Sequence, residues 1–154
     1  MGLNVILCDY QGNFKKKITD DFFIIDGSNV AYQDRNYQKK PQLKNLTIIK
    51  QKLETLGIKN YHIICDRSLN YTIDDKENYK KLVKKSIIIE TPEGTKADIF
   101  ILQITQEKNG YNISNDIFKS YYKLYEPDWI KHRRISFKII DDNIFFDKLI
   151  LKDV

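Results

Sequence analysis

The sequence predicts a three-layer α/β/α sandwich around a central parallel sheet, and two observations predict it. Short, almost wholly apolar runs, such as FFIID at 22–26 and YHIIC at 61–65, alternate with longer stretches of helical periodicity. Strands buried on both faces have this composition, and strands separated by helices form parallel sheets covered on both sides. No linker composition or repeat divides the 154 residues. We therefore expect one domain over 21–154, preceded by an N-terminal extension or edge hairpin over 1–20.

The first βαβ unit is the clearest part of the pattern. After the strand at 22–27, leucine and isoleucine mark one face of a helix over 41–57, which Gly57 is placed to end. A strand at 60–66 follows. The later elements are predicted in the same alternation: a helix at 74–85 before SIIIETP, a helix at 96–108 before GYNISND, and a last helix before a strand at RISFKII.

Composition narrows the class of protein only a little. The formal charge of +5, from 26 Lys and Arg against 21 Asp and Glu, weakly favours a polyanionic partner. Cys8 and Cys65 each close an apolar run, so we expect neither a disulfide nor a zinc site. No apolar run approaches the roughly 20 residues that span a bilayer. The N-terminus lacks the basic, then apolar, then small residues of a signal peptide. We expect a cytoplasmic protein with no membrane partner.

Aspartates follow three of the predicted strands or begin the next helix. Asp26 ends the strand at 22–26, Asp98 begins a helix after SIIIETP, and Asp116 ends GYNISND. Ligands of open parallel sheets bind beyond the carboxyl ends of the strands. Each aspartate could simply stabilise a helix N-terminus by about 0.3–1 kcal/mol. That role does not explain why all three are expected at the same carboxyl edge of the sheet. Oxygen ligands in such a group suit Mg²⁺, which activates water for attack on a phosphodiester.

Three strings resemble the motifs of NYN domains of the PIN-like superfamily, particularly those of the Regnase-type ribonucleases. They are FFIIDGSNVAY, ISND and RISFKIIDDNIFF, and the resemblance covers about residues 22–147 in order. It implies an endoribonuclease that depends on Mg²⁺ or Mn²⁺, with Asp26, Asp98 and Asp116 as metal ligands and Asn29 as the polar partner of Asp26. It also implies a catalytic role for Asp75, which matches the aspartate that opens the helix before the third strand.

Two positions depart from the family's pattern. Ala97 and Ser120 stand where the family often has further acids. A catalytically weak or inactive RNA-binding module is therefore one alternative, and a PIN or flap-type nuclease acting on DNA is another.

The expected substrate is single-stranded or loop RNA, because the chain has no helix or motif that reads base pairs. Basic residues after the first and second strands can offset the repulsion between acids and phosphates, and a tyrosine can stack on an unpaired base. The resemblance further implies that the domain can pair as a homodimer. Six residues are assigned to substrate contacts: Asn29, Tyr32, Lys39, Lys40, Arg67 and Asn115.

Overall fold

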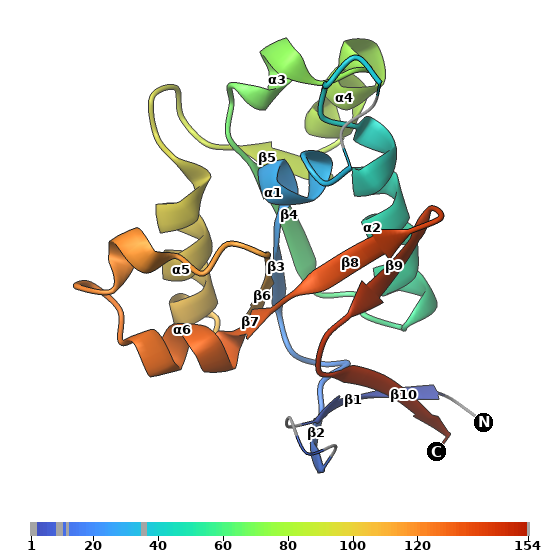
Figure 1. The fold of residues 1–154 in the computed structure, drawn as a ribbon, viewed down its shortest axis with the longest axis vertical. Coiled ribbons are helices and arrows are strands. Elements are labelled where there is room, and N and C mark those ends of the chain that lie inside the picture. The colour runs from blue at the N-terminus through green and yellow to red at the C-terminus, as the bar shows by residue number, and fades with distance from the viewer. Residues whose placement is uncertain (1–2, 9–10, 12, 35–36, 154) are drawn as a thin grey trace.

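A five-stranded parallel sheet lies at the centre of the computed structural model, which describes residues 3–8, 11, 13–34 and 37–153 (Figure 1). The strand order is β5-β4-β3-β6-β7, and every neighbouring pair is parallel. The central strand β3 therefore ends in the middle of the sheet's carboxyl edge. The five strands are β3 (Phe23–Asp26), β4 (Tyr61–Cys65), β5 (Ile88–Glu90), β6 (Tyr111–Ile113) and β7 (Arg134–Ile135).

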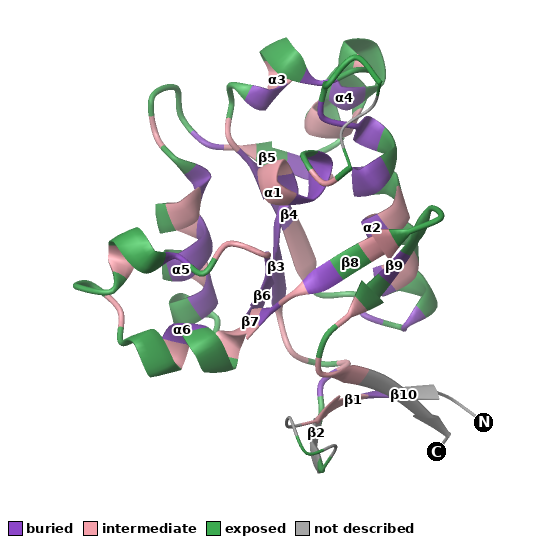
Figure 2. Cartoon of the chain, in the orientation of Figure 1, coloured by how far each residue is buried: buried purple, intermediate pink, exposed green. Residues whose placement is uncertain are grey.

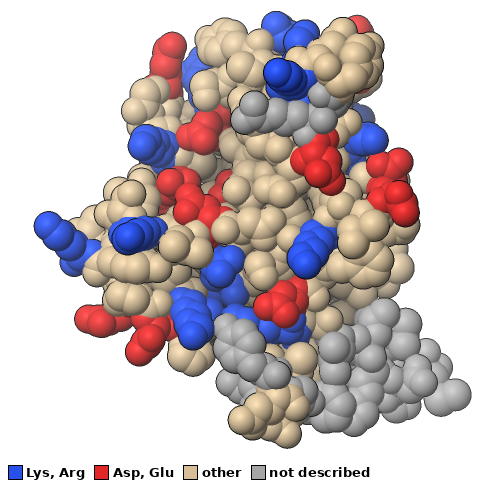
Figure 3. Space-filling view, in the orientation of Figure 1, with Lys and Arg blue, Asp and Glu red and all other residues tan. Residues whose placement is uncertain are grey.

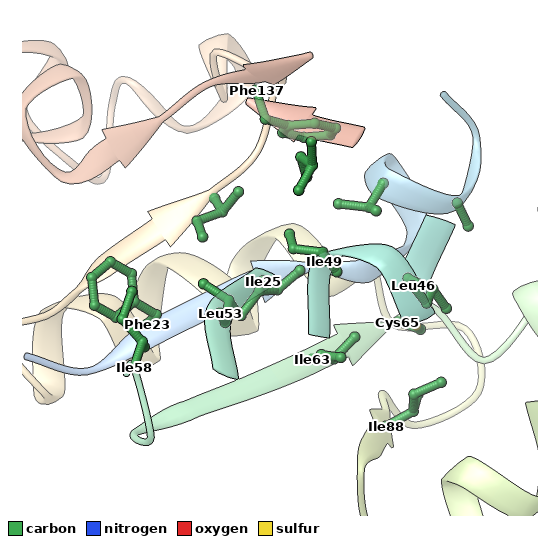
Figure 4. Close-up of a cluster of buried hydrophobic side chains, with 14 of the residues drawn as sticks. Phe23, Ile25, Leu46, Ile49, Leu53, Ile58, Ile63, Cys65, Ile88 and Phe137 are labelled. Atoms are coloured by element: carbon green, nitrogen blue, oxygen red, sulfur yellow. The ribbon is translucent and has the colours of Figure 1, made fainter. Parts of the chain in front are cut away.

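Helices cover both faces of this sheet, which confirms the predicted three layers. Alternate residues of β3 point to opposite faces, so Phe23 and Ile25 pack on the side of α2 and α4, and Ile24 packs on the side of α5 and α6. Figure 4 shows side chains of the larger of the two clusters, and Figure 2 shows that β3 is buried along its length. The helices are α1 (Gly27–Ala31), α2 (Leu43–Thr55), α3 (Leu69–Thr72), α4 (Lys76–Lys84), α5 (Ala97–Glu107), α6 (Pro127–Arg133) and the 3₁₀ helix η1 (Lys119–Tyr121).

The run RISFKII does not form one strand, so that prediction is wrong. The chain leaves the parallel sheet after β7, and β8 (Phe137–Ile140) pairs instead with β9 (Asn143–Phe146) in an antiparallel hairpin. The side chain of Asn115 causes the break: its Nδ2 donates to the carbonyl of Phe137 at 3.0 Å, and its Oδ1 accepts from the Phe137 N–H at 2.9 Å. A side chain thus takes the two hydrogen bonds that a neighbouring strand would make.

The two ends of the chain meet in a second, smaller sheet. β1 (Leu3–Cys8) lies between β2 (Phe14–Lys17) and β10 (Leu149–Asp153), and both pairings are antiparallel. The N-terminal hairpin is therefore joined to the C-terminal strand and lies at one end of the molecule, away from the carboxyl edge of the central sheet (Figure 1). Over the described residues, no helix has both the length and the apolar composition needed to cross a membrane.

Candidate active site

Asp26 is the central residue of the acidic edge. It ends β3 and caps α1: its Oδ1 accepts from the Asn29 N–H at 3.2 Å, and its Oδ2 accepts from the Ser114 hydroxyl at 2.7 Å. The residue is only 4% exposed. Gly27 makes this turn possible, because a Cβ there would lie 2.4 Å from Cys65 Sγ and 3.0 Å from the Ile64 carbonyl oxygen. A glycine is needed for α1 to start directly against β4.

Three further aspartates lie at the same edge. Asp66 follows β4, and its Oδ1 accepts from the Ala97 N–H at 2.7 Å, which fixes the start of α5. Asp98 is then in the first turn of α5. Asp116 follows β6, and its Oδ1 accepts from the Phe118 N–H at 2.9 Å. A group of acidic side chains is visible between α5 and α1 in Figure 3.

Burial and mutual repulsion make these carboxyl groups hard to ionise together. The pKa of Asp26 is raised to about 7: burial raises it most, the two hydrogen bonds lower it, and the charges of Asp98 and Asp116 add to the rise. Burial also raises the pKa of Asp98, as do the charges of Asp116 and Asp66, whereas Lys96 lowers it. The edge thus holds more negative charge than the protein itself compensates.

The structure does not bring Asp75 to this group. Its carboxylate caps α4, accepting from the Asn78 N–H at 3.1 Å and from Asn78 Nδ2 at 2.7 Å, and these bonds lower its pKa. The neighbouring Asp74 accepts from the Leu43 N–H at the start of α2. The charges that raise the pKa of Asp26 come from Asp98 and Asp116, and those that raise the pKa of Asp98 come from Asp116 and Asp66. The structure thus places Asp66 beside this group and Asp75 at the start of α4, so the position of Asp75 gives no support to its predicted catalytic role.

A cleft that holds two cations adjoins the acidic edge through Asp66, and we call it the Arg67 cleft. It has a volume of about 220 Å³, and its lining includes Arg67, Lys96 and Tyr71 as well as the carboxylates of Asp66 and Glu93. Tyr71 is 63% exposed. The predicted contact residue Arg67 is thus placed beside the acids, together with a second cation and an aromatic ring that the sequence did not single out.

The other predicted basic residues lie elsewhere. Lys39 and Lys40 are exposed in the loop between α1 and α2, where the Pro41 carbonyl accepts from the Asp74 N–H near α4. The hydroxyl of Tyr32 lies 3.2 Å from Thr72 Oγ1 in α3. The structure therefore places Tyr32 beside α3, and Lys39 and Lys40 in the loop that reaches the start of α4.

Asn29 and Asn115 lie at the site, but their amide groups hold the scaffold together. Asn29 Oδ1 accepts from the Asn115 N–H at 2.9 Å, which ties α1 to the segment after β6. The amide of Asn115 is bound to the backbone of Phe137, as described above. Both residues position the site, and the structure supplies no separate group on Asn115 for a substrate.

The chemistry of the acidic edge fits a divalent cation. Mg²⁺ is usually held by one or two carboxylates, with waters completing its coordination. Asp26, Asp98 and Asp116 offer such carboxylates, and burial together with neighbouring negative charges raises the pKa values of Asp26 and Asp98, so a positive charge at this edge would be stabilising. Among the described residues, no three His, Cys, Asp or Glu side chains already converge as a complete ligand set. The residues fit a cation that retains much of its water.

Two residues of the site were missed from sequence. Asp66 ends an apolar strand just as Asp26 does, so the same rule about strand ends could have found it. Ser114 is buried and binds both the Asp26 carboxylate and the Asp116 N–H. Only its polar character at the end of an apolar strand pointed to this role.

A parallel α/β sandwich with clustered aspartates at the carboxyl edge defines the class of NYN-type nucleases. The chain belongs to the Zc3h12a-like ribonuclease NYN domain family, whose model matches residues 19–152. No curated protein matches the sequence significantly.

Solved structures show the same fold. Two structures of the protein-only RNase P 2 (PRORP2) of Arabidopsis thaliana superpose with TM-scores of 0.64 and 0.65 at 15% sequence identity. They cover 84% and 82% of this chain, which spans 30% of the PRORP2 chain in each. At this sequence identity the likeness shows a shared fold and nothing further.

Proposed function

We propose that the chain is an endoribonuclease that depends on Mg²⁺ or Mn²⁺ and cleaves single-stranded or loop RNA. The observation that carries the proposal is the meeting of Asp26, Asp98 and Asp116 at one edge, with the pKa of Asp26 raised to about 7. A carboxyl group buried beside two others is costly unless a cation or proton balances it. Membership of a ribonuclease family supports RNA as the substrate.

Each residue of the edge has a definite task in this proposal. Asp26, Asp98 and Asp116 would hold the cation, which supplies positive charge and activates a water for attack on the phosphodiester. Ser114 orients Oδ2 of Asp26 by its hydrogen bond, and Asp66 fixes the turn that carries Asp98. These contacts keep the carboxylates in place, so little reorganisation is needed when RNA binds.

The cations and the tyrosine of the Arg67 cleft support a strand with exposed bases as the substrate. Arg67 and Lys96 can each contact a phosphate, and Tyr71 offers a ring on which an unpaired base can stack for about 1–3 kcal/mol. The acids and these cations lie side by side, so a strand held by the cations passes the carboxylates. Homodimer formation and cytoplasmic location remain predictions.

A catalytically inactive RNA-binding module is the second candidate. Ala97 stands where the family often has an acid, and it is 1% exposed in the apolar cluster beneath α5. The site thus has one carboxylate fewer at this position. In this case the Arg67 cleft would bind RNA, and the remaining acids would not support cleavage.

Cleavage of a labelled single-stranded RNA with Mn²⁺, Mg²⁺ or EDTA tests the proposal. Asp26→Asn should abolish cutting, whereas the matched control Asp75→Asn, which also exchanges a helix-capping aspartate, should leave it near the wild-type rate. A DNA oligomer of the same sequence tests the DNA alternative. RNA that is bound but remains uncut with every metal would establish the binding module instead.

A further inference from the structure

A groove of about 750 Å³ lies next to the acidic edge, between the residues that follow α1 and the β8–β9 hairpin. Gln33 and Asp34 line one side, and the hairpin lines the other. Asn115, the residue directly before Asp116, also lines it, so the groove opens beside the acids. Its volume lies within the range of about 300–1,000 Å³ that is typical of ligand sites.

The hairpin has one face in the core and one face in solvent. Phe137 and Ile144 are buried, whereas Lys138 and Phe145 stand directly opposite each other on the outer face. Phe145 is 56% exposed, and its ring is therefore not used to build the core. Directly opposite residues of an antiparallel pair lie close enough for their side chains to contact one ligand. The pair offers an aromatic surface with a cation beside it.

The charges around the groove favour a base over a phosphate. Among the described residues that line it, Lys138 is the one cation, and Asp34 and Asp147 contribute two carboxylates. Two carboxylates repel a run of phosphates, but they accept hydrogen bonds from the amino group of a base. The visible surface between the acidic group and the hairpin is mainly uncharged, as a site for a flat, neutral ring requires (Figure 3).

We propose that this groove binds one unpaired nucleobase that carries an exocyclic amino group, from the RNA strand that enters the acidic edge. The base stacks on Phe145, its amino group donates to Asp34, and Lys138 contacts the adjoining phosphate. Uracil lacks the amino group and presents carbonyl oxygens, so adenine and cytosine bind better than uracil. The inference rests on the proposed ribonuclease function and adds a preference for certain bases at one position.

Binding of labelled adenine and uracil decamers in EDTA, with the intact chain, tests the stacking. Phe145→Leu keeps an apolar side chain but removes the ring, and it should weaken binding of the adenine decamer about 5-fold to 100-fold. Phe145→Trp restores a ring and should keep the wild-type affinity or improve it. The substitutions fall on the outer face of the hairpin, and circular dichroism would show that the fold is retained.

A second variant tests the preference for an amino group. Asp34 has a φ of 45°, a conformation that asparagine adopts readily, so Asp34→Asn exchanges the carboxylate without backbone strain. An amide both donates and accepts, so the variant should bind the adenine and uracil decamers with more similar affinities than the wild type does.

The outcomes separate this inference from the function on which it depends. If the wild type cuts RNA with Mn²⁺ but Phe145→Leu binds and cuts as the wild type does, the groove is not on the RNA path and the inference fails alone. The same holds if Phe145→Leu instead converts a dimer to a monomer in sedimentation, because the hairpin is then a contact between copies. A wild type that neither binds nor cuts RNA overturns both proposals.

Discussion

Asp26→Asn should stabilise the cation-free protein at pH 8, although it removes a residue of the active site. Burial raises the pKa of Asp26 from 3.8 to about 7. Each pKa unit corresponds to about 1.4 kcal/mol, so ionising Asp26 in the folded chain costs about 4 kcal/mol at pH 8. The amide that replaces it carries no charge and can still cap α1 through its oxygen.

The sign of the pH dependence follows from proton binding. Between pH 4 and pH 7 the folded state retains the Asp26 proton, whereas the unfolded state has lost it. The stability that this group contributes is therefore complete below pH 4 and is lost as the pH rises through about 7. The variant lacks this loss, so the difference in unfolding free energy between the two proteins should grow with pH.

Disruption of the hydrogen bond from Ser114 offsets part of the stability that Asp26→Asn gains. The Ser114 hydroxyl donates to Oδ2 of Asp26 and accepts from the Asp116 N–H, so it must reorient to face an amide nitrogen. A lost hydrogen bond costs about 0.5–1.5 kcal/mol. We therefore expect a net stabilisation of about 2.5–3.5 kcal/mol at pH 8 and much less at pH 5.

Urea unfolding in EDTA at pH 5, 6, 7 and 8, followed by circular dichroism, measures this difference. Adding Mn²⁺ at pH 8 should stabilise the wild type more than the variant, because the cation replaces the proton as the compensating charge. A difference that stays constant across this pH range would refute the argument, since it would mean that Asp26 ionises as easily in the folded chain as in water.

Three further predictions concern neighbouring residues. Both side-chain polar atoms of Asn112 are buried without a hydrogen-bond partner in β6, so Asn112→Leu should raise the unfolding free energy by about 1–3 kcal/mol in a urea titration. Asn115→Ala removes both side-chain bonds to Phe137 and should lower it by about 1–3 kcal/mol, with faster amide exchange confined to β8 and β9. Asp66→Asn keeps an oxygen for the Ala97 N–H but removes a charge, so thermal stability in EDTA should change little while the gain in Tm from Mn²⁺ falls.

Local sequence pattern was sufficient for the layers of the fold but not for the end of the sheet. The run RISFKII is apolar throughout, and nothing within it marks the point where the chain leaves the sheet. That point is set by Asn115, which is distant in sequence and binds the Phe137 backbone. A contact between segments about twenty residues apart cannot be deduced from periodicity, which reports only which face of an element is buried.

The aspartates assigned to the site also differ in how they were predicted. Asp26, Asp98 and Asp116 were found because strand ends share an edge in a parallel sheet, a rule that needs only the order of elements. The assignment of Asp75 rested on resemblance, and a helix cap alone accounts for its position. Asp66 directly follows a strand, so the same rule applies to it, and its hydrogen bond to the Ala97 N–H holds it beside α5, whereas Asp75 caps α4.

Helix capping and metal binding are therefore not competing explanations for these carboxylates. Asp26, Asp66 and Asp116 each accept a hydrogen bond from a backbone N–H, which fixes the direction of the carboxylate. Carboxylates held in this way cannot swing apart. Burial, and to a lesser extent the neighbouring charges, therefore raises the pKa of Asp26, and a proton or a cation stabilises the group. A stable fold and a site ready to receive positive charge thus depend on the same hydrogen bonds.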